Sequence, residues 1–203
     1  MQWSLLRGYK NSGVSTQFMA KEMDAGDILL QIPVAIDANE NGKELQERMK
    51  KMGGTLLVQT LDQLEAGSLT PRPQDHSKAT LAPLLKKDDG AILWEKSSAW
   101  EIHNQIRGLY PWPAAYTHCQ GKRIKILRSR HSEEKISPPT SAPGSLAFHD
   151  DRLWVRCADT ILEILELQPE GKRPQLPAEF MNGMKSSKES DQNFLFHSAT
   201  EKL

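Results

Sequence analysis

Residues 13–30 read GVSTQFMAKEMDAGDILL. Val14, Thr16 and Phe18 alternate with polar or small residues, which predicts a β-strand, and the run Ile28–Val34 predicts a second, buried strand. The acidic loop Met23–Asp27 joins them, and Gly26 offers the positive φ that a turn can need. Asp24 would then stand at a strand end, where a carboxylate can face a cleft. The alternative is an ordinary turn aspartate that hydrogen-bonds its own backbone.

The clearest helix is predicted over residues 42–66. Apolar residues recur there at steps of three and four, and Gly67 is a suitable C-terminal stop. The apolar positions are Leu45, Met49, Met52, Leu56, Leu57, Leu61 and Leu64. Gly53-Gly54 marks either a close backbone approach or a break. Alternating strands and helix predict an α/β layer for this first unit.

Bulk properties exclude some classes of protein. The formal net charge is zero, so a nucleic-acid partner would need a local basic patch. No apolar run is long enough to span a membrane, and the N-terminal residues do not resemble a secretory signal. The chain begins abruptly, as if within a domain. Its two cysteines, Cys119 and Cys157, leave a disulfide open, and a reducing cytoplasm is the default location.

A second unit follows a Pro-interrupted linker that we expect to pack through Leu81, Leu84 and Ile92. Ser98 and Glu101 form a capping-box pattern that predicts a helix, which Pro111-Trp112-Pro113 ends. Short strands are then predicted at Ala114–His118, Arg123–Arg128, Ser145–Phe148, Leu153–Cys157 and Thr160–Leu167, with a last helix near Ala178–Met181. Several short strands in a small all-β unit favour an OB-like barrel. The tail from Lys185 is predicted to be disordered apart from Phe194–Phe196.

Two kinds of chemistry can be weighed from the residues of this second unit. A metal site built on His118, Cys119 and Cys157 is disfavoured, because structural zinc needs four ligands at close spacing. A basic cluster is more informative: Lys122, Arg123, Lys125, Arg128, Arg130 and Lys135. On a strand that buries Ile124 and Ile126, such cations could meet a phosphate backbone. A solvated strand face remains equally compatible with this pattern.

Several short motifs in order resemble the methionyl-tRNA formyltransferase family. They are Met23-Asp24-Ala25-Gly26-Asp27, the helix ending TLDQLEAG (60–67), PRPQD (71–75), TLAP (80–83), ILW (92–94), IRGLYPWPAAY (106–116), GKRIKI (121–126) and LQPEGK (167–172). The resemblance runs from Met1 to about Gly183. It departs from the family where Leu81 and Leu84 replace a tyrosine and a lysine, and where Leu93 replaces an aspartate.

The resemblance implies four regions. Residues 1–73 would be the C-terminal part of a Rossmann-like formyltransferase domain, 74–95 a linker, 96–184 the OB-like tRNA-binding domain, and 185–203 a disordered tail. It implies formyl transfer from 10-formyltetrahydrofolate to the α-amine of methionyl initiator tRNA in translation initiation, by a cytoplasmic monomer without a metal. Asp24 would be catalytic, and Glu22, Met23 and Asp24 would line the folate pocket. Lys86, Lys87, Lys122, Arg123 and Lys125 would contact tRNA.

The family's catalytic group also contains an Asn-x-His pair, which precedes a Ser-Leu-Leu-Pro loop and lies before the stretch that Met1 begins. We therefore expect little or no turnover by residues 1–203 alone, because the oxyanion stabilisers would be missing. Two alternatives remain open: a non-catalytic tRNA-binding fragment, and another formyltetrahydrofolate-dependent enzyme such as a sugar-amine formyltransferase or a hydrolase.

Overall fold

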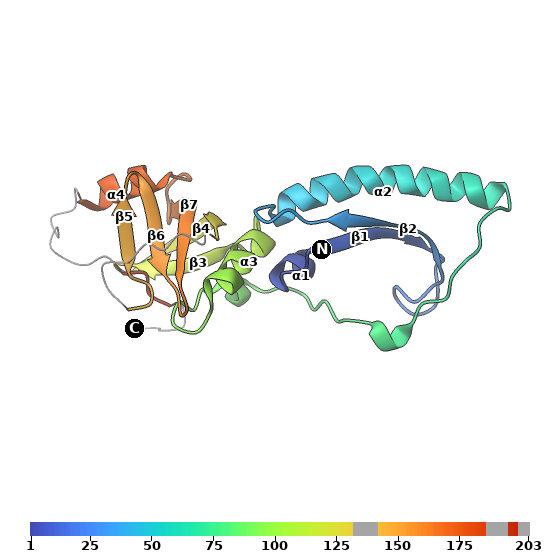
Figure 1. The fold of residues 1–203 in the computed structure, drawn as a ribbon, viewed down its shortest axis with the longest axis horizontal. Coiled ribbons are helices and arrows are strands. Elements are labelled where there is room, and N and C mark those ends of the chain that lie inside the picture. Colours follow the sequence, from blue (N-terminus) through green and yellow to red (C-terminus); the bar gives the residue numbers. More distant parts are fainter. Residues whose placement is uncertain (132–141, 186–194, 199–203) are drawn as a thin grey trace.

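The computed structural model describes residues 1–131, 142–185 and 195–198. Two units lie end to end in an elongated molecule (Figure 1). The first contains α1 (Gln2–Leu6), β1 (Asn11–Gln17), β2 (Ile28–Ala35) and α2 (Gly42–Glu65). The second contains α3 (Ala99–Leu109), β3 (Ala115–Cys119), β4 (Lys122–Arg130), β5 (Leu146–His149), β6 (Arg152–Arg156), β7 (Ile161–Pro169) and α4 (Pro177–Lys185). Two short 3₁₀ turns, η1 (His76–Lys78) and η2 (Lys87–Gly90), lie between them.

The first unit is an antiparallel hairpin covered on one face by α2 (Figure 1). Thr16 on β1 pairs with Leu30 on β2, and the Thr16 and Thr60 hydroxyls lie 2.8 Å apart between sheet and helix. Leu5, Val34 and Leu45 form the buried core. The two predicted strands are therefore confirmed, and Val14 and Thr16 face the helix. Phe18 instead follows β1 and is 44% exposed, and Val34 alone is buried on β2, so the prediction of a buried second strand is wrong.

Helix α2 confirms the prediction for residues 42–66. Asn41 accepts hydrogen bonds from the amides of Lys43 and Glu44, and the Glu44 carboxylate accepts from the Asn41 amide, which completes a capping box. The glycine pair does not break the helix. A Cβ on Gly53 would lie 3.5 Å from Val14 Cγ1, an ordinary van der Waals contact, so the packing of helix against strand does not require a glycine there.

The predicted apolar face of α2 is wrong at its C-terminal half. Leu56 is 2% exposed, whereas Leu57, Leu61 and Leu64 lie largely or partly in solvent, with Leu57 52% exposed. A sheet of two strands covers only a narrow arc of a helix. Leu57 and Leu61 therefore lie on the helix face beside the one that packs on the sheet, and they extend past its edge.

The second unit is a five-stranded antiparallel sheet in the order β3-β4-β7-β6-β5. Alternate residues of its strands pack with α3 and α4 around one core, which includes Ile106, Ile126, Leu153 and Phe180. Among the described residues, the two edge strands β3 and β5 do not pair directly, so the sheet remains open. The segment 195–198 lies between these edges, with bridges from His197 to His118 and from Leu195 to Ser145.

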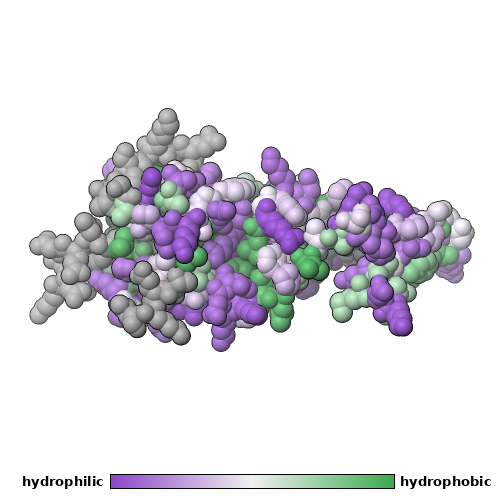
Figure 2. All heavy atoms as spheres, turned by 90° about the horizontal axis from the view of Figure 1, so that it is seen from below, coloured by the Kyte–Doolittle hydropathy of each residue, from purple (hydrophilic) through white to green (hydrophobic). Residues whose placement is uncertain are grey.

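The linker does not pack as predicted. Ile92 is fully buried in the core of the second unit, but Leu81 and Leu84 are 84% and 86% exposed. The chain is instead held there by its main-chain oxygens: Trp3 Nε1 donates to Pro83 O at 2.8 Å and Arg7 Nη2 donates to Leu81 O at 2.7 Å. Seen from below, hydrophobic residues gather near the middle of the molecule (Figure 2).

Burial limits the chemistry of the two cysteines. Cys119 and Cys157 are free and buried, and burial raises the pKa of their thiols to about 11 and about 12. Buried thiols of this kind are poor nucleophiles.

Within the described ranges, no group of three His, Cys, Asp or Glu residues could hold a metal ion. No helix in the described part of the chain is long and apolar enough to cross a membrane.

Candidate functional site

The loop between β1 and β2 depends on a close backbone approach at Gly26. A Cβ there would lie 1.8 Å from the carbonyl oxygen of Phe18, so no larger residue fits without moving the strand. Phe18 N donates to Asp27 O at 3.0 Å across the base of the loop. Asp24, and not Gly26, has the left-handed conformation, with φ of 56°. Aspartate tolerates this region better than most residues.

The side chain of Gln74 fixes this loop from outside. Its Nε2 donates to Asp24 O at 2.8 Å and to Gly26 O at 2.6 Å, and it also lies 3.0 Å from Gln17 Oε1. Gln17 Nε2 in turn donates to the Asp24 carboxylate at 3.3 Å. Gln74 lies at the start of the predicted linker, and its contact with this loop is not apparent from the sequence. The loop backbone is thus held while the Asp24 side chain stays exposed.

Glu22 and Met23, the other predicted folate-binding residues, precede Asp24 in the same loop and are exposed. Met23 is 92% exposed, which leaves a large apolar side chain beside a carboxylate in open solvent. An exposed, fixed carboxylate can accept a proton from a bound amine, and an apolar side chain beside it can contact a flat ring.

The predicted tRNA-binding residues do not form one continuous group. Arg123 and Lys125 point to the outer face of β4, whereas Lys122 lies on the other side and lines a separate cavity of about 330 Å³ with Phe180 and Met184. Lys86 and Lys87 are exposed at the start of η2, close to Asp88 and Asp89.

Two other cations of the basic cluster are already paired. Arg128 forms an ion pair with Glu44 of α2, and Arg130 Nη1 lies 3.6 Å from the buried Glu163. These arginines therefore serve contacts within the protein. Lys135 lies outside the described residues.

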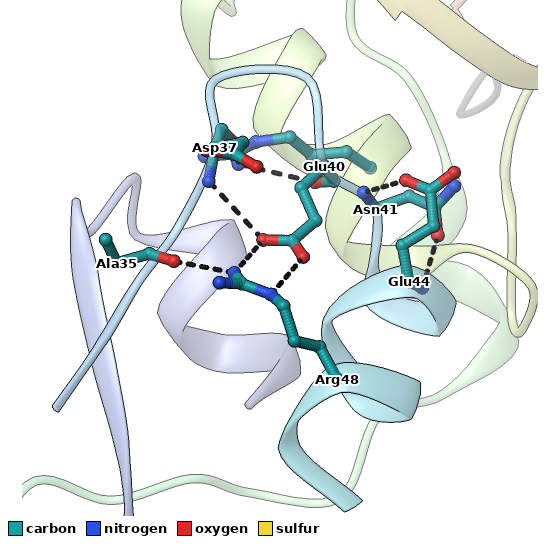
Figure 3. A network of polar contacts seen from close by, with 7 residues as sticks. Ala35, Asp37, Glu40, Asn41, Glu44 and Arg48 are labelled. Atoms are coloured by element: carbon teal, nitrogen blue, oxygen red, sulfur yellow. Dashed lines mark hydrogen bonds and ion pairs between the residues drawn. The ribbon is translucent and has the colours of Figure 1, made fainter. Parts of the chain in front are cut away.

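The two units are joined by a polar network at the start of α2. Arg48 donates to Glu40 at 2.6 Å and to the Ala35 carbonyl, beside the Asn41–Glu44 capping box (Figure 3). Arg107 of α3 reaches across and donates to Asp37 O at 3.2 Å. The network fixes the turn between β2 and α2 against the second unit.

His103 completes the junction. Its Nε2 lies 2.9 Å from Ala38 O, and its Nδ1 lies 2.9 Å from Ser129 Oγ. A neutral ring satisfies both contacts, by donating to the carbonyl and accepting from the hydroxyl. Burial, with a smaller effect from the charge of Arg107, lowers the pKa of His103 to about 4. The sequence near His103 does not indicate these contacts, because their partners lie 26 and 65 positions away along the chain.

Comparison with known proteins identifies the family. Residues 84–185 match the family model described as formyl transferase, C-terminal domain, and residues 1–61 match the one described as formyl transferase. The chain belongs to the formyl transferase family. Both parts of this formyl transferase are therefore recognised, on either side of the exposed linker.

Curated relatives of this formyl transferase are named methionyl-tRNA formyltransferase. Those of Thermodesulfovibrio yellowstonii and Solibacter usitatus are 37% identical over 191 residues and 42% identical over 185 residues. The matches cover 94% and 91% of this chain, and 60% and 58% of the relatives. The chain thus spans about 60% of the length of these relatives.

Solved structures share the fold at lower identity. HypX from Aquifex aeolicus, in complex with tetrahydrofolic acid, superposes with a TM-score of 0.67 at 17% identity over 92% of this chain and 32% of that one. An N-formyltransferase from Helicobacter canadensis gives 0.63 at 19% identity over 79% and 57% of the two chains. These likenesses establish the formyltransferase fold and nothing finer.

Proposed function

We propose that this chain acts in the formylation of methionyl initiator tRNA, with 10-formyltetrahydrofolate as the formyl donor. The observation that carries the proposal is the identity of 36–42% over about 90% of the chain to relatives named methionyl-tRNA formyltransferase. The more distant likeness to the Helicobacter canadensis protein supports only the fold, so the tRNA substrate is preferred to a sugar amine.

In this proposal the methionyl amine attacks the formyl carbon of the donor, and the bond from that carbon to the folate nitrogen breaks. Asp24 accepts the proton that the amine loses, and the folate nitrogen regains a proton as it leaves. A positioned carboxylate typically contributes about 10²–10⁴-fold to such a step. The backbone of Glu22, Met23 and Asp24, held by Gln74, would line the folate pocket.

The remaining assignments follow the same family. Residues 1–73 would contribute to the catalytic domain, 74–95 would link, 96–184 would form an OB-like tRNA-binding domain, and the protein would act as a cytoplasmic monomer. The cationic side chains of Lys86, Lys87, Lys122, Arg123 and Lys125 would contact the phosphate backbone.

The test has two parts, both on residues 1–203. Binding of a fluorescein-labelled bacterial initiator tRNA, measured by anisotropy across a salt series, should weaken steeply as salt rises. Formylation of methionyl-tRNA should be slight for the parent chain and absent for Asp24→Asn. Vigorous turnover that Asp24→Asn abolishes would confirm the catalytic role and refute the expectation of low activity. Absence of tRNA binding at low salt would refute the proposed function.

A further inference from the structure

The outer face of the β3–β4 hairpin carries two aromatic side chains opposite two cationic ones. Tyr116 lies opposite Lys125, and His118 lies opposite Arg123. Their neighbours Ala115, Thr117, Ile124 and Ile126 are buried on the inner face. An aromatic ring, an imidazole and two cations therefore share one surface that does not contribute to the core.

The guanidinium of Arg123 stacks on this surface. Its Cζ lies 3.6 Å from the centroid of the Tyr116 ring, within the range of a close cation–π contact. The ring is itself fixed: a Cβ at Gly90 of the linker would lie 3.1 Å from Tyr116 Cδ1, and His118 meets the ring edge-on at 5.9 Å. A guanidinium held against a ring in this way has fewer orientations open to its N–H groups.

Arg123 and Lys125 differ in their pairing from Arg128 and Arg130, the two ion-paired arginines of β4. Over residues 1–131, 142–185 and 195–198, no ion pair joins either one to an acidic side chain. Arg123 Nε is buried without a hydrogen-bond partner. Both side chains line a cavity of about 260 Å³ with Gln168, Pro169, Glu170 and Gly171. The one carboxylate there, from Glu170, leaves the cavity with a net positive charge.

We propose that Arg123 and Lys125 form a subsite for one phosphodiester of the tRNA backbone, and that Tyr116 is the positioning residue that orients Arg123. A planar guanidinium binds phosphate through two parallel N–H groups, which needs the orientation that the stack provides. This inference rests on the proposed function, and it excludes Lys122 from the subsite because Lys122 lines the other cavity.

The experiment measures the salt dependence of initiator-tRNA binding to residues 1–203 by anisotropy. Arg123→Gln should reduce the slope of log K against log salt by about one, as expected for the loss of one phosphate contact. Its affinity at low salt should fall about tenfold. Tyr116→Ala should weaken binding about two- to fivefold by releasing the guanidinium, and Tyr116→Phe should bind as the parent does, since it keeps the ring.

Matched controls separate the subsite from a general charge effect. Arg173→Gln removes the same charge from the same unit, but Arg173 is paired with Glu179 at 2.9 Å. Lys51→Gln is the control for Lys125→Gln, because Lys51 is exposed on α2. Both controls should keep the slope of the parent.

The outcomes distinguish the two proposals. If the parent chain does not bind tRNA, the proposed function fails. If the parent binds and Arg123→Gln has the same slope as Arg173→Gln, only the subsite is refuted. Should Tyr116→Ala unfold, as a thermal melt would reveal, the comparison of Tyr116→Phe with Arg123→Gln still decides. Equal displacement of tRNA from parent and Arg123→Gln by inorganic phosphate would also refute the subsite.

Discussion

The side-chain amide of Gln74 donates to the main-chain carbonyl oxygen of Asp24 at 2.8 Å. The same amide donates to Gly26 O at 2.6 Å, so a residue beyond the C-terminal end of α2 fixes the loop that carries the candidate catalytic carboxylate. Because both contacts reach the backbone, they leave the Asp24 carboxylate exposed, with a hydrogen bond from Gln17 Nε2 at 3.3 Å.

Replacement of Gln74 by alanine should loosen this loop. The loss of these hydrogen bonds should cost about 1–2 kcal/mol and raise the rate of amide hydrogen exchange at residues 24–28. Gln63→Ala, on the exposed side of α2, is the control and should leave exchange unchanged. Equal exchange in the two variants would show that Gln74 does not hold the loop.

Adjacent leucines of α2 should respond differently to truncation. Leu56→Ala empties a buried site and should lower the free energy of unfolding by about 2–5 kcal/mol. Leu57→Ala should change it by less than about 0.5 kcal/mol, since that side chain is half exposed. Urea unfolding monitored by circular dichroism measures both. A similar cost for the two would mean that the exposed side of α2 is covered in solution.

His103 should make stability depend on pH. Its folded pKa of about 4 lies below the usual 6.5, so the unfolded chain binds the proton more readily. The contribution of neutral His103 to the free energy of unfolding should be fully present above pH 6.5. It should fall as the pH drops toward 4, by up to about 3 kcal/mol.

His103→Gln tests this pH dependence, because glutamine does not titrate. The variant should be less stable near pH 7 but should show a shallower fall in the same pH range. The exposed His149 is the control, and His149→Gln should retain the full slope. An unchanged slope in His103→Gln would assign the acid sensitivity to other groups.

Phe196 should stabilise the second unit although it is distant in sequence from that core. It is 1% exposed and lies 5.9 Å from Trp94 and 6.3 Å from Phe180, measured between ring centroids. Phe196→Ala should therefore cost about 3–5 kcal/mol and shift the emission of Trp94 to the red. Leu195→Ala, at a half-buried neighbour, should cost clearly less. A neutral Phe196→Ala would show that the segment 195–198 detaches in solution.

Local patterns predicted α2, the Ser98–Glu101 capping box of α3 and the two strands on either side of the Asp24 loop, because spacing, glycine positions and capping chemistry act over a few residues. They could not predict which leucines of α2 are covered, since that depends on the width of the sheet beneath. The pairing of Arg128 with Glu44 was equally hidden, because the two residues are 84 positions apart. The basic pattern therefore overstated the number of cations available on β4.

The position of Gln74 was hidden for a related reason. Its side chain acts across the gap between the end of α2 and the β1–β2 loop, 50 residues from Asp24. Nothing in the sequence near either residue indicates such a contact. The family motif placed both residues in order along the chain without stating that they touch.

The junction between the units has a consequence for the reach of the molecule. Trp3 and Arg7 of the first unit bind the linker, and Arg107, His103 and Arg128 of the second unit contact the first unit directly. The units can rotate against each other only if these contacts break. While they hold, the distance from the Asp24 loop to the outer face of β4 is constant, and under the proposed function a tRNA that contacts both places must span that distance.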